Sequence, residues 1–272
     1  MRPQVLTIAG TDSGGGAGIQ ADLKTFEERG VYGMSVIVAV TAQNTKGVQG
    51  IFPMPVDSIV RQMESIADDF SIAALKTGML FDAERIEAVV DGIKRFKWRP
   101  LVVDPVMIAK GGTHLVAPEA IATIKKKLVP VADVITPNTP EAEVLSEMTI
   151  RTDQDREHAA RLILKRGAGA VLLKGGHDLV TSETVRDCLV TREQTIWLES
   201  KRIDTVHTHG TGCTLSSLIT AELAKGHPLE DSVKTAKKLL TRAISESPGI
   251  GHGHGPIAHW VLRDEDGERL QS

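Results

Sequence analysis

The sequence predicts one α/β domain, with a mostly parallel central sheet and helices on both of its faces. The first observation is that short β-branched runs alternate with amphipathic helical patterns along most of the chain. The second is the length of 272 residues, which suits one large α/β unit. The third is that polar or glycine-rich segments follow several predicted strands, at the edge where such sheets bind ligands. We therefore interpret residues 1–272 as a single domain.

The first half of the chain predicts strands and helices in alternation. A buried strand at Val5–Ala9 stops at Gly10, and the apolar stripe of a helix at Ala17–Glu28 ends before Gly30. The same reasoning gives strands at Ser35–Ala42, Gly47–Phe52 and Ala73–Leu80, and helices at Val56–Asp69 and Asp82–Phe96.

Prolines and a charged turn mark the elements of the second half. Strands at Leu101–Pro105 and Asp133–Thr136 are stopped by proline, which cannot donate to the ladder. Consecutive strands at Val185–Val190 and Thr195–Leu198 predict an antiparallel hairpin. The polar segment 261–272 is expected to be a loose tail. The other predicted elements are the strand Ala170–Lys174 and helices at Pro118–Leu128, Glu141–Leu145, Asp153–Lys165, Thr214–Lys225 and Leu229–Ser247.

Composition excludes several classes of function. The chain is 41% hydrophobic and 25% charged, as is typical of a globular protein with a sizeable core. A net charge of −3 and an aromatic content of 3% argue against a nucleic-acid partner. No apolar run approaches the ~20 residues of a membrane span. The two cysteines fit neither a disulfide framework nor a zinc site, so we expect a cytoplasmic protein with no membrane partner.

A glycine-rich segment, Gly10–Gly18, connects the first strand to the first helix. It fails the G-x-G-x-x-G spacing of a dinucleotide fingerprint, and no Gly-Lys-Ser/Thr follows to make a phosphate P-loop. A flexible connector is the alternative, but a connector does not need so many glycines. We interpret the segment as backbone that contacts a ligand.

Charged residues follow three predicted strands. Asp104 ends one strand, and Asn138 and Glu141 open the helix after the next. Capping alone would explain Asn138 and Glu141, but Glu141 and Asp104 can also hold a magnesium ion through water. Lys174 follows three apolar residues and precedes two glycines, which favours a cation aimed into the ligand crevice over a solvated strand end.

The segment Thr208–Thr214 predicts an anion site. Two glycines just before a helix leave backbone N–H groups unpaired and directed outward. Cys213 would lie in the first turn of that helix, where the helix dipole lowers the pKa of a thiol. Cys188, in contrast, is interpreted as a small buried hydrophobe.

Three histidines, His252, His254 and His259, lie close together in the glycine-rich segment Gly249–His259. A metal site is one interpretation, although no acidic residue or cysteine is near in sequence. A tight glycine loop that closes the chain against the sheet is the favoured interpretation.

Eight segments, taken together, resemble a known family. They are Leu6–Asp22, Val40–Thr45, Lys76–Leu80, Val103–Met107, Thr136–Glu141, Lys174–His177, His209–Cys213 and Gly253–Pro256. In these segments the chain resembles the ribokinase-like superfamily and, within it, the hydroxymethylpyrimidine/phosphomethylpyrimidine kinases of thiamine biosynthesis. Each segment alone is a weak signal, but the combination spans nearly the whole chain in family order and is specific.

The resemblance implies an ATP-dependent kinase of a small pyrimidine, with Mg²⁺ as a cofactor. The loop before the last helices would surround the transferring phosphoryl group, and most superfamily members carry an aspartate base where this chain has cysteine. Short strands within 33–54 would form a small lid, which in relatives often contacts a second subunit, so a homodimer is expected. The implied catalytic residues are Lys174, Gly210, Thr211, Gly212 and Cys213; the implied ATP contacts are Asn138, Lys174 and Thr211; the implied Mg²⁺ ligands are Asp104 and Glu141; and the implied substrate contacts are Gly10, Asp12, Ala17, Gln43, Met79 and Val106.

Three other functions remain to be weighed. Some relatives with the same cysteine loop act on pyridoxal, although Thr41–Thr45 and the first glycine loop are more similar to the pyrimidine kinases. A dinucleotide-dependent oxidoreductase is disfavoured by the glycine spacing. A non-catalytic binder is disfavoured because Asp104, Glu141 and Lys174 are all present.

Overall fold

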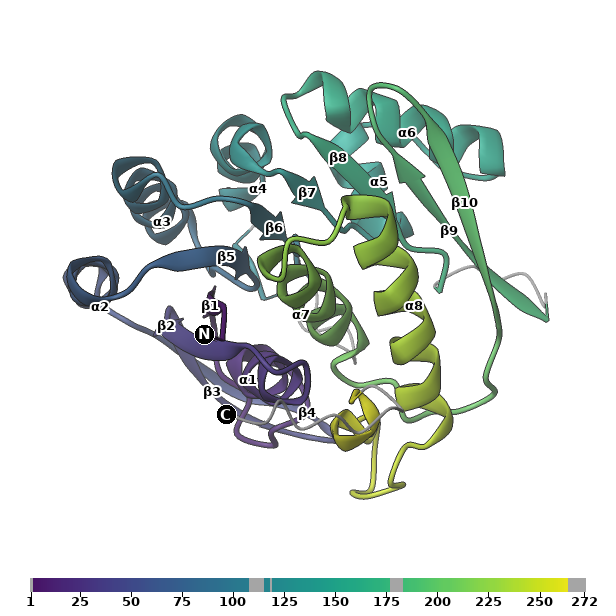
Figure 1. Cartoon of the computed structure of the whole chain (residues 1–272), viewed down its shortest axis with the longest axis horizontal. Coiled ribbons are helices and arrows are strands. Elements are labelled where there is room, and N and C mark those ends of the chain that lie inside the picture. Colours follow the sequence, from purple (N-terminus) through teal and green to yellow (C-terminus); the bar gives the residue numbers. More distant parts are fainter. Residues whose placement is uncertain (1, 108–114, 118, 177–182, 264–272) are drawn as a thin grey trace.

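A computed structural model of the chain describes residues 2–107, 115–117, 119–176 and 183–263. Its main sheet has eight strands, in the order β10-β9-β8-β7-β6-β5-β1-β2 (Figure 1). β9 runs antiparallel to β8 and β10, and the other neighbours are parallel. The strands of this sheet are β1 (Gln4–Ala9), β2 (Tyr32–Ile37), β5 (Ile72–Thr77), β6 (Leu101–Val103), β7 (Val134–Ile135), β8 (Ala170–Leu173), β9 (Thr184–Val190) and β10 (Thr195–Lys201).

Helices cover both faces of the sheet, as the alternating pattern predicts (Figure 1). One face packs against α1 (Gly18–Glu28), α7 (Thr211–Ala224) and α8 (Leu229–Ser245). The other face packs against α2 (Val56–Asp69), α3 (Ala83–Phe96), α4 (Ala120–Thr123), α5 (Thr139–Ser146) and α6 (Asp153–Lys165). The short strand β6 shows why both faces are filled, because Leu101 and Val103 enter one core and Val102 enters the other.

The predicted strand Ser35–Ala42 is wrong, because the chain leaves the main sheet in the middle of it. β2 ends at Ile37, and β3 (Ala39–Asn44) pairs with β4 (Gly47–Pro53) in a separate antiparallel hairpin. Val38 is the pivot: its N–H donates to Ala9 O (2.9 Å), and its carbonyl accepts from the Met54 N–H (2.8 Å). The separate hairpin is therefore Ala39–Pro53 and not the whole of 33–54.

Several other boundaries differ from the sequence predictions. The predicted helix Pro118–Leu128 becomes α4 followed by a π turn at Ile124–Leu128 and a 3₁₀ turn at Val129–Val131, and Pro118 itself lies outside the described residues. The helices predicted from Glu141 and Thr214 begin two and three residues earlier, at Thr139 and Thr211. The predicted loose tail starts too early, because Leu262 is fully buried and its carbonyl accepts from Arg29 Nη1 (2.8 Å); residues 264–272 lie outside the described part.

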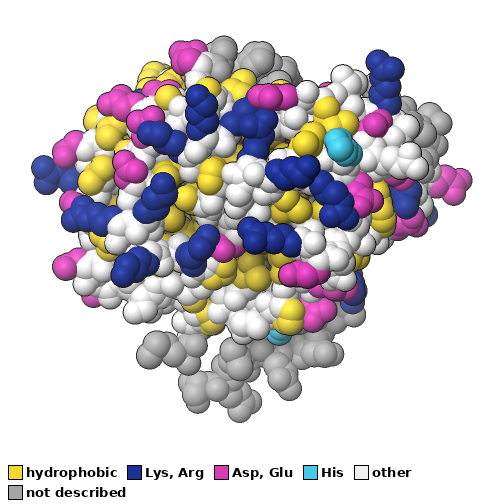
Figure 2. Space-filling model, turned by 90° about the horizontal axis from the view of Figure 1, so that it is seen from above, with side chains coloured by type: hydrophobic (Ala, Val, Ile, Leu, Met, Phe, Trp, Pro, Cys, Tyr) yellow, Lys and Arg dark blue, Asp and Glu magenta, His cyan; other side chains and the backbone are white. Residues whose placement is uncertain are grey.

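The outer surface mixes both signs of charge. Figure 2 shows one face on which lysine and arginine side chains lie among aspartate and glutamate. Exposed pairs such as Arg95–Glu64 and Arg61–Asp57 join several of these charges, and each contributes little to stability because solvent screens it. Within the part of the chain that the structure describes, no helix has the length and apolar character needed to cross a membrane.

Candidate functional site

A cavity of about 560 Å³ opens at the carboxyl ends of the parallel strands. The chain passes from β1 outward to β2 and then returns to the other side of β1 as β5. The topological switch point of the sheet therefore lies between β1 and β5. All but one of the site residues predicted from the sequence line this cavity. They are Gly10, Ala17, Gln43, Met79, Asp104, Val106, Asn138, Glu141, Lys174, Gly210, Thr211, Gly212 and Cys213.

Asp12 does not line the cavity, contrary to its predicted substrate contact. Its carboxylate is 1% exposed and accepts hydrogen bonds from the N–H groups of Gly14, Gly16 and Ala17 at 2.8–3.0 Å. His209 Nε2 lies 2.8 Å from Asp12 Oδ2. Asp12 therefore shapes the first glycine loop from inside. Of that loop, only Gly10, Thr11, Ala17 and Gly18 line the cavity, and Gly16 is buried against His209.

The loop Gly210–Cys213, which we call the anion loop, forms the first turn of α7. Gly210 has φ = +82°, and a Cβ there would overlap the carbonyl oxygen of Gly16, so only glycine fits. A Cβ at Gly212 would lie 3.3 Å from Asp104 Oδ2 and 3.5 Å from Lys174 Nζ. First-turn amides have no acceptor within their own helix, so those of the anion loop can bind an anion next to Lys174.

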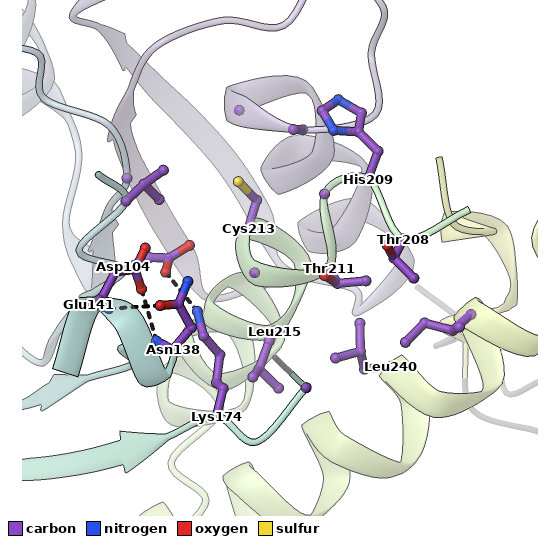
Figure 3. Close-up of a pocket in the computed structure, with 18 of the residues that line it drawn as sticks. Asp104, Asn138, Glu141, Lys174, Thr208, His209, Thr211, Cys213, Leu215 and Leu240 are labelled. Carbon is purple, nitrogen blue, oxygen red and sulfur yellow. Dashed lines mark hydrogen bonds and ion pairs between the residues drawn. The ribbon is translucent and has the colours of Figure 1, made fainter. Parts of the chain in front are cut away.

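One end of the cavity carries two carboxylates and an ammonium group (Figure 3). Lys174 Nζ lies 3.2 Å from Asp104 Oδ1, and the Lys174 backbone continues β8 as a bridge to Asn138. Burial opposes the positive charge on Lys174, but the carboxylates of Asp104 and Glu141 outweigh it and raise its pKa. Lys174 is therefore a fixed cation at this end of the cavity.

Glu141 both caps a helix and faces this charged end. Its backbone N–H donates to Asn138 Oδ1 and its Oε2 accepts from the Asn138 N–H, each at 2.9 Å, so the predicted capping is confirmed. Burial raises the pKa of the Glu141 carboxyl to about 7, with Lys174 opposing and Asp104 adding to the rise. This carboxyl therefore holds its charge less readily than an exposed glutamate does.

The predicted low pKa of Cys213 is wrong. Burial raises the pKa of its thiol to about 12, although Lys76 nearby acts in the opposite direction and the Gly18 N–H donates to the sulfur. The cost of desolvating a thiolate here outweighs the lowering of the pKa that a helix N-terminus provides. Cys213 is therefore an uncharged group at neutral pH.

We expect both cysteines to resist alkylation in the folded protein. Burial also raises the pKa of Cys188 to about 12, so the thiolate fraction of either residue at pH 8 is on the order of 10⁻⁴. Mass spectrometry after iodoacetamide treatment at pH 8 should find neither residue modified, whereas the urea-unfolded chain should be labelled at both. Fast labelling of folded Cys213 would show that its thiol is ionised.

The other end of the cavity is apolar with one amide. The pairing of β3 and β4 shifts register between Ala42 and Gln43, and such a bulge re-aims the side chain that follows it. Gln43 Oε1 lies 3.3 Å from Thr41 Oγ1, and the Gln43 amide nitrogen lies 3.5 Å from His209 Nε2. Met79 packs on Gly10, where a Cβ would come 2.5 Å from the Met79 methyl group.

Sequence reasoning missed a third part of the cavity, formed by β9, β10 and α8. Lys237 Nζ lies 2.6 Å from Asp187 Oδ2, and Asp187 Oδ1 accepts from the Gly175 N–H at 2.8 Å. This buried pair ties the turn after Lys174 to α8. The signal was an aspartate that directly precedes the apolar run Cys188–Val190 of a strand, which indicates a buried partner.

The three histidines of the C-terminal glycine loop do not converge. His259 is buried with its Nε2 3.0 Å from Thr214 Oγ1, whereas His252 and His254 are exposed. The described residues contain no group of three or more histidine, cysteine or acidic side chains able to hold a metal ion. The predicted glycine loop is confirmed, but it packs on the β3–β4 turn, where the His254 N–H donates to Thr45 O (2.8 Å).

Comparison with known proteins gives consistent results. The profile of the phosphomethylpyrimidine kinase family matches residues 12–258. A hydroxymethylpyrimidine/phosphomethylpyrimidine kinase of Haemophilus influenzae is 54% identical over 260 residues, which are 95% of this chain and 97% of that protein. A protein of the same description from Bacillus subtilis is 46% identical over 260 residues, with 96% of each chain covered.

Solved structures show the same fold. A phosphomethylpyrimidine kinase of Clostridium difficile matches with a TM-score of 0.79 and 44% identity, over 89% of this chain and 100% of that one. An ADP complex of a Bacillus subtilis pyridoxal kinase matches with a TM-score of 0.89 and 41% identity, over 96% of this chain and 99% of that one. The fold and the cavity thus define a ribokinase-like kinase. Within that class, the chain belongs to the phosphomethylpyrimidine kinase family.

Proposed function

We propose that the protein transfers a phosphoryl group from ATP to hydroxymethylpyrimidine, and then a second one to the resulting monophosphate, in thiamine biosynthesis. The observation that carries this proposal is that one cavity joins the anion loop, Lys174 and two carboxylates to an apolar end with the Gln43 amide. Phosphoryl transfer depends mainly on positioning and charge stabilisation, which these groups can supply.

The residues at each end of the cavity have separate tasks in this proposal. Lys174, with Asn138 and Thr211, contacts the ATP phosphates. The amides of the anion loop stabilise the negative charge that develops on the transferring group. Gly10, Ala17, Met79 and Val106 surround the pyrimidine, and Gln43 reads its ring nitrogen and exocyclic amine.

Asp104 and Glu141 fit a magnesium ion in this proposal. Asp104 Oδ2 is buried and has no hydrogen-bond partner among the described residues, and burial disfavours the charge on Glu141 even with Lys174 nearby, so a further cation would stabilise both carboxylates. Two carboxylates, with water and phosphate oxygens completing the shell, are a usual donor set for Mg²⁺. When bound, the ion neutralises charge on the ATP phosphates.

Product analysis after incubation with ATP, Mg²⁺ and hydroxymethylpyrimidine tests the proposed function. We expect both the monophosphate and the diphosphate. Pyridoxal is the second acceptor to include, because a Staphylococcus aureus pyridoxal kinase solved with pyridoxal matches 100% of this chain with a TM-score of 0.89 and 32% identity. Faster turnover of pyridoxal than of the pyrimidine would contradict the proposed substrate.

Gln43→Leu should raise the KM for the pyrimidine far more than the KM for ATP. The variant removes an amide that pairs with the polar edge of the ring, so that edge is left unpaired in a buried site, which costs about 1–3 kcal/mol, or roughly 5- to 150-fold. Steady-state kinetics with each substrate varied in turn measures both constants. Gln49→Leu, in the exposed part of the same hairpin, is the matched control. Equal changes in both KM values would place Gln43 outside the pyrimidine subsite.

We further propose that the protein acts in the cytoplasm as a homodimer through the β3–β4 hairpin. Val40 and Phe52 face each other in the hairpin register and are 42% and 62% exposed. Such an apolar pair on a surface hairpin favours association. Sedimentation analysis should find two chains per particle, and the double variant Val40→Lys, Phe52→Lys should sediment as one chain.

A further inference from the structure

His209 lines the cavity immediately before the anion loop, yet the proposed function assigns it no task. The residue is 8% exposed, and its Nε2 lies 2.8 Å from the Oδ2 of Asp12, which is itself 1% exposed. Figure 3 shows the His209 ring and the Cys213 thiol on the opposite side of the anion loop from Lys174.

The hydrogen bond between His209 and Asp12 has a defined direction. Burial opposes the charge on Asp12, but His209 and the backbone N–H groups of Ala17 and Gly14 outweigh it and hold the pKa of the carboxyl below its ordinary value. An ionised carboxylate can only accept, so His209 Nε2 carries the hydrogen and donates it to Asp12. Gln43 Nε2, 3.5 Å from the same nitrogen, is then not a donor to His209 and stays free for substrate.

The imidazole ring joins two loops that carry different parts of the site. The ring packs on Gly16, where a Cβ would lie 2.7 Å from His209 Cδ2, and the His209 N–H donates to Gly255 O at 3.1 Å. The next residue is Gly210, which itself packs on the Gly16 carbonyl. The first glycine loop, Gly10–Gly18, supplies Ala17 to the side of the cavity proposed to hold the phosphoryl acceptor, which we call the acceptor wall. The segment that contains His209 leads into the anion loop and its amides.

We propose that His209 is a positioning residue for phosphoryl transfer, which holds the anion loop against the acceptor wall by donating from Nε2 to Asp12. This inference rests on the proposed function. The reacting atoms must lie about 3–3.5 Å apart and in line, and a misplacement of about 1 Å can cost on the order of 10²-fold in rate. A loss of this bond would let the two loops separate and would lower kcat without removing any group that touches ATP.

Replacing His209 by side chains that carry an amide at different distances from the backbone, or none, tests the inference. His209→Gln keeps an N–H donor at nearly the reach of Nε2, whereas His209→Asn carries the same amide on a shorter stem, and His209→Leu carries no donor. We expect kcat to fall by about tenfold or more in the Leu and Asn variants, for both phosphorylation steps, and to stay within about threefold of wild type in the Gln variant. The KM for ATP should change little in all three. His158→Leu, at an exposed histidine of α6, is the matched control.

A double-mutant cycle with Asp12→Asn shows whether the two residues act as one unit. The factors by which His209→Leu and Asp12→Asn lower kcat should not multiply in the double variant. Thermal unfolding of each variant separates lost positioning from lost folding, and the Gln and Asn pair remains informative if the Leu variant does not fold.

Three outcomes would overturn the inference. Normal kcat in the Asn and Leu variants would show that the bond is not needed. Equal loss in the Gln and Leu variants, confined to the alcohol step, would instead make His209 the base for the alcohol proton. Multiplicative losses in the double variant would mean that Asp12 and His209 act separately. Wild-type protein that does not phosphorylate the pyrimidine would refute the proposed function itself, which is a different result.

Discussion

Lys174→Ala should lower kcat at saturating ATP by on the order of 10²-fold or more. Lys174 is the ammonium group beside the anion loop, and the carboxylates of Asp104 and Glu141 keep it charged and in place although burial opposes its charge. Removing one preorganised donor from a site that stabilises developing charge typically costs 10²- to 10³-fold. The loss should be in kcat more than in the KM for ATP, because the charge on the transferring group grows in the transition state.

The control for this prediction is Lys238→Ala, at an exposed lysine of α8. Removing Lys174 also leaves Asp104 and Glu141 without their cation, so the midpoint of thermal unfolding must be measured alongside the rate. Turnover of Lys174→Ala near the wild-type rate, with the fold intact, would mean that the phosphates bind elsewhere in the cavity.

The position of the site was predictable because it depends on strand ends. Asp104, Asn138 and Lys174 each follow a short apolar run, and parallel strands bring such positions to one edge. That the anion loop binds an anion stays a prediction, although its place at the first turn of a helix on the cavity wall agrees with the glycine pattern. These signals are local, so the sequence alone carries them.

The errors arise where a residue's surroundings come from distant parts of the chain. Asp12 was assigned to substrate because its loop was, but its carboxylate is enclosed by amides of that loop and by His209 from the other end of the chain. The pKa of Cys213 depends on burial beneath the N-terminus of α1, which no spacing reveals. The division of Ser35–Ala42 at Val38 follows from hydrogen bonds to Ala9 and Met54, while the apolar pattern continues unbroken.

The un-ionised thiol of Cys213 suggests why this chain has cysteine where most of the superfamily has an aspartate base. An alcohol acceptor must lose a proton, so a base helps the first step. The acceptor of the second step is a phosphate monoester, largely ionised at neutral pH with a second pKa of ~6, and it needs no base. A carboxylate at this position would repel it, whereas a neutral thiol does not.

Cys213→Asp should therefore keep phosphorylation of the alcohol and impair phosphorylation of the monophosphate. Burial, Asp22 and Asp104 raise the pKa of a group at position 213, whereas Lys76, fully buried with its Nζ 2.8 Å from Asp22 Oδ1, lowers it. The expected repulsion applies to the ionised form of the introduced carboxyl. A carboxylate about 4 Å from the incoming phosphate would oppose it by ~4 kcal/mol per unit charge pair at an effective dielectric near 20, or roughly 10³-fold in rate. Cys213→Ala adds no charge and should change the two steps by similar, smaller factors. The two rates are measured separately, with the alcohol and with the purified monophosphate as acceptors. An equal loss in both steps for Cys213→Asp would show that charge at this position does not distinguish the two acceptors.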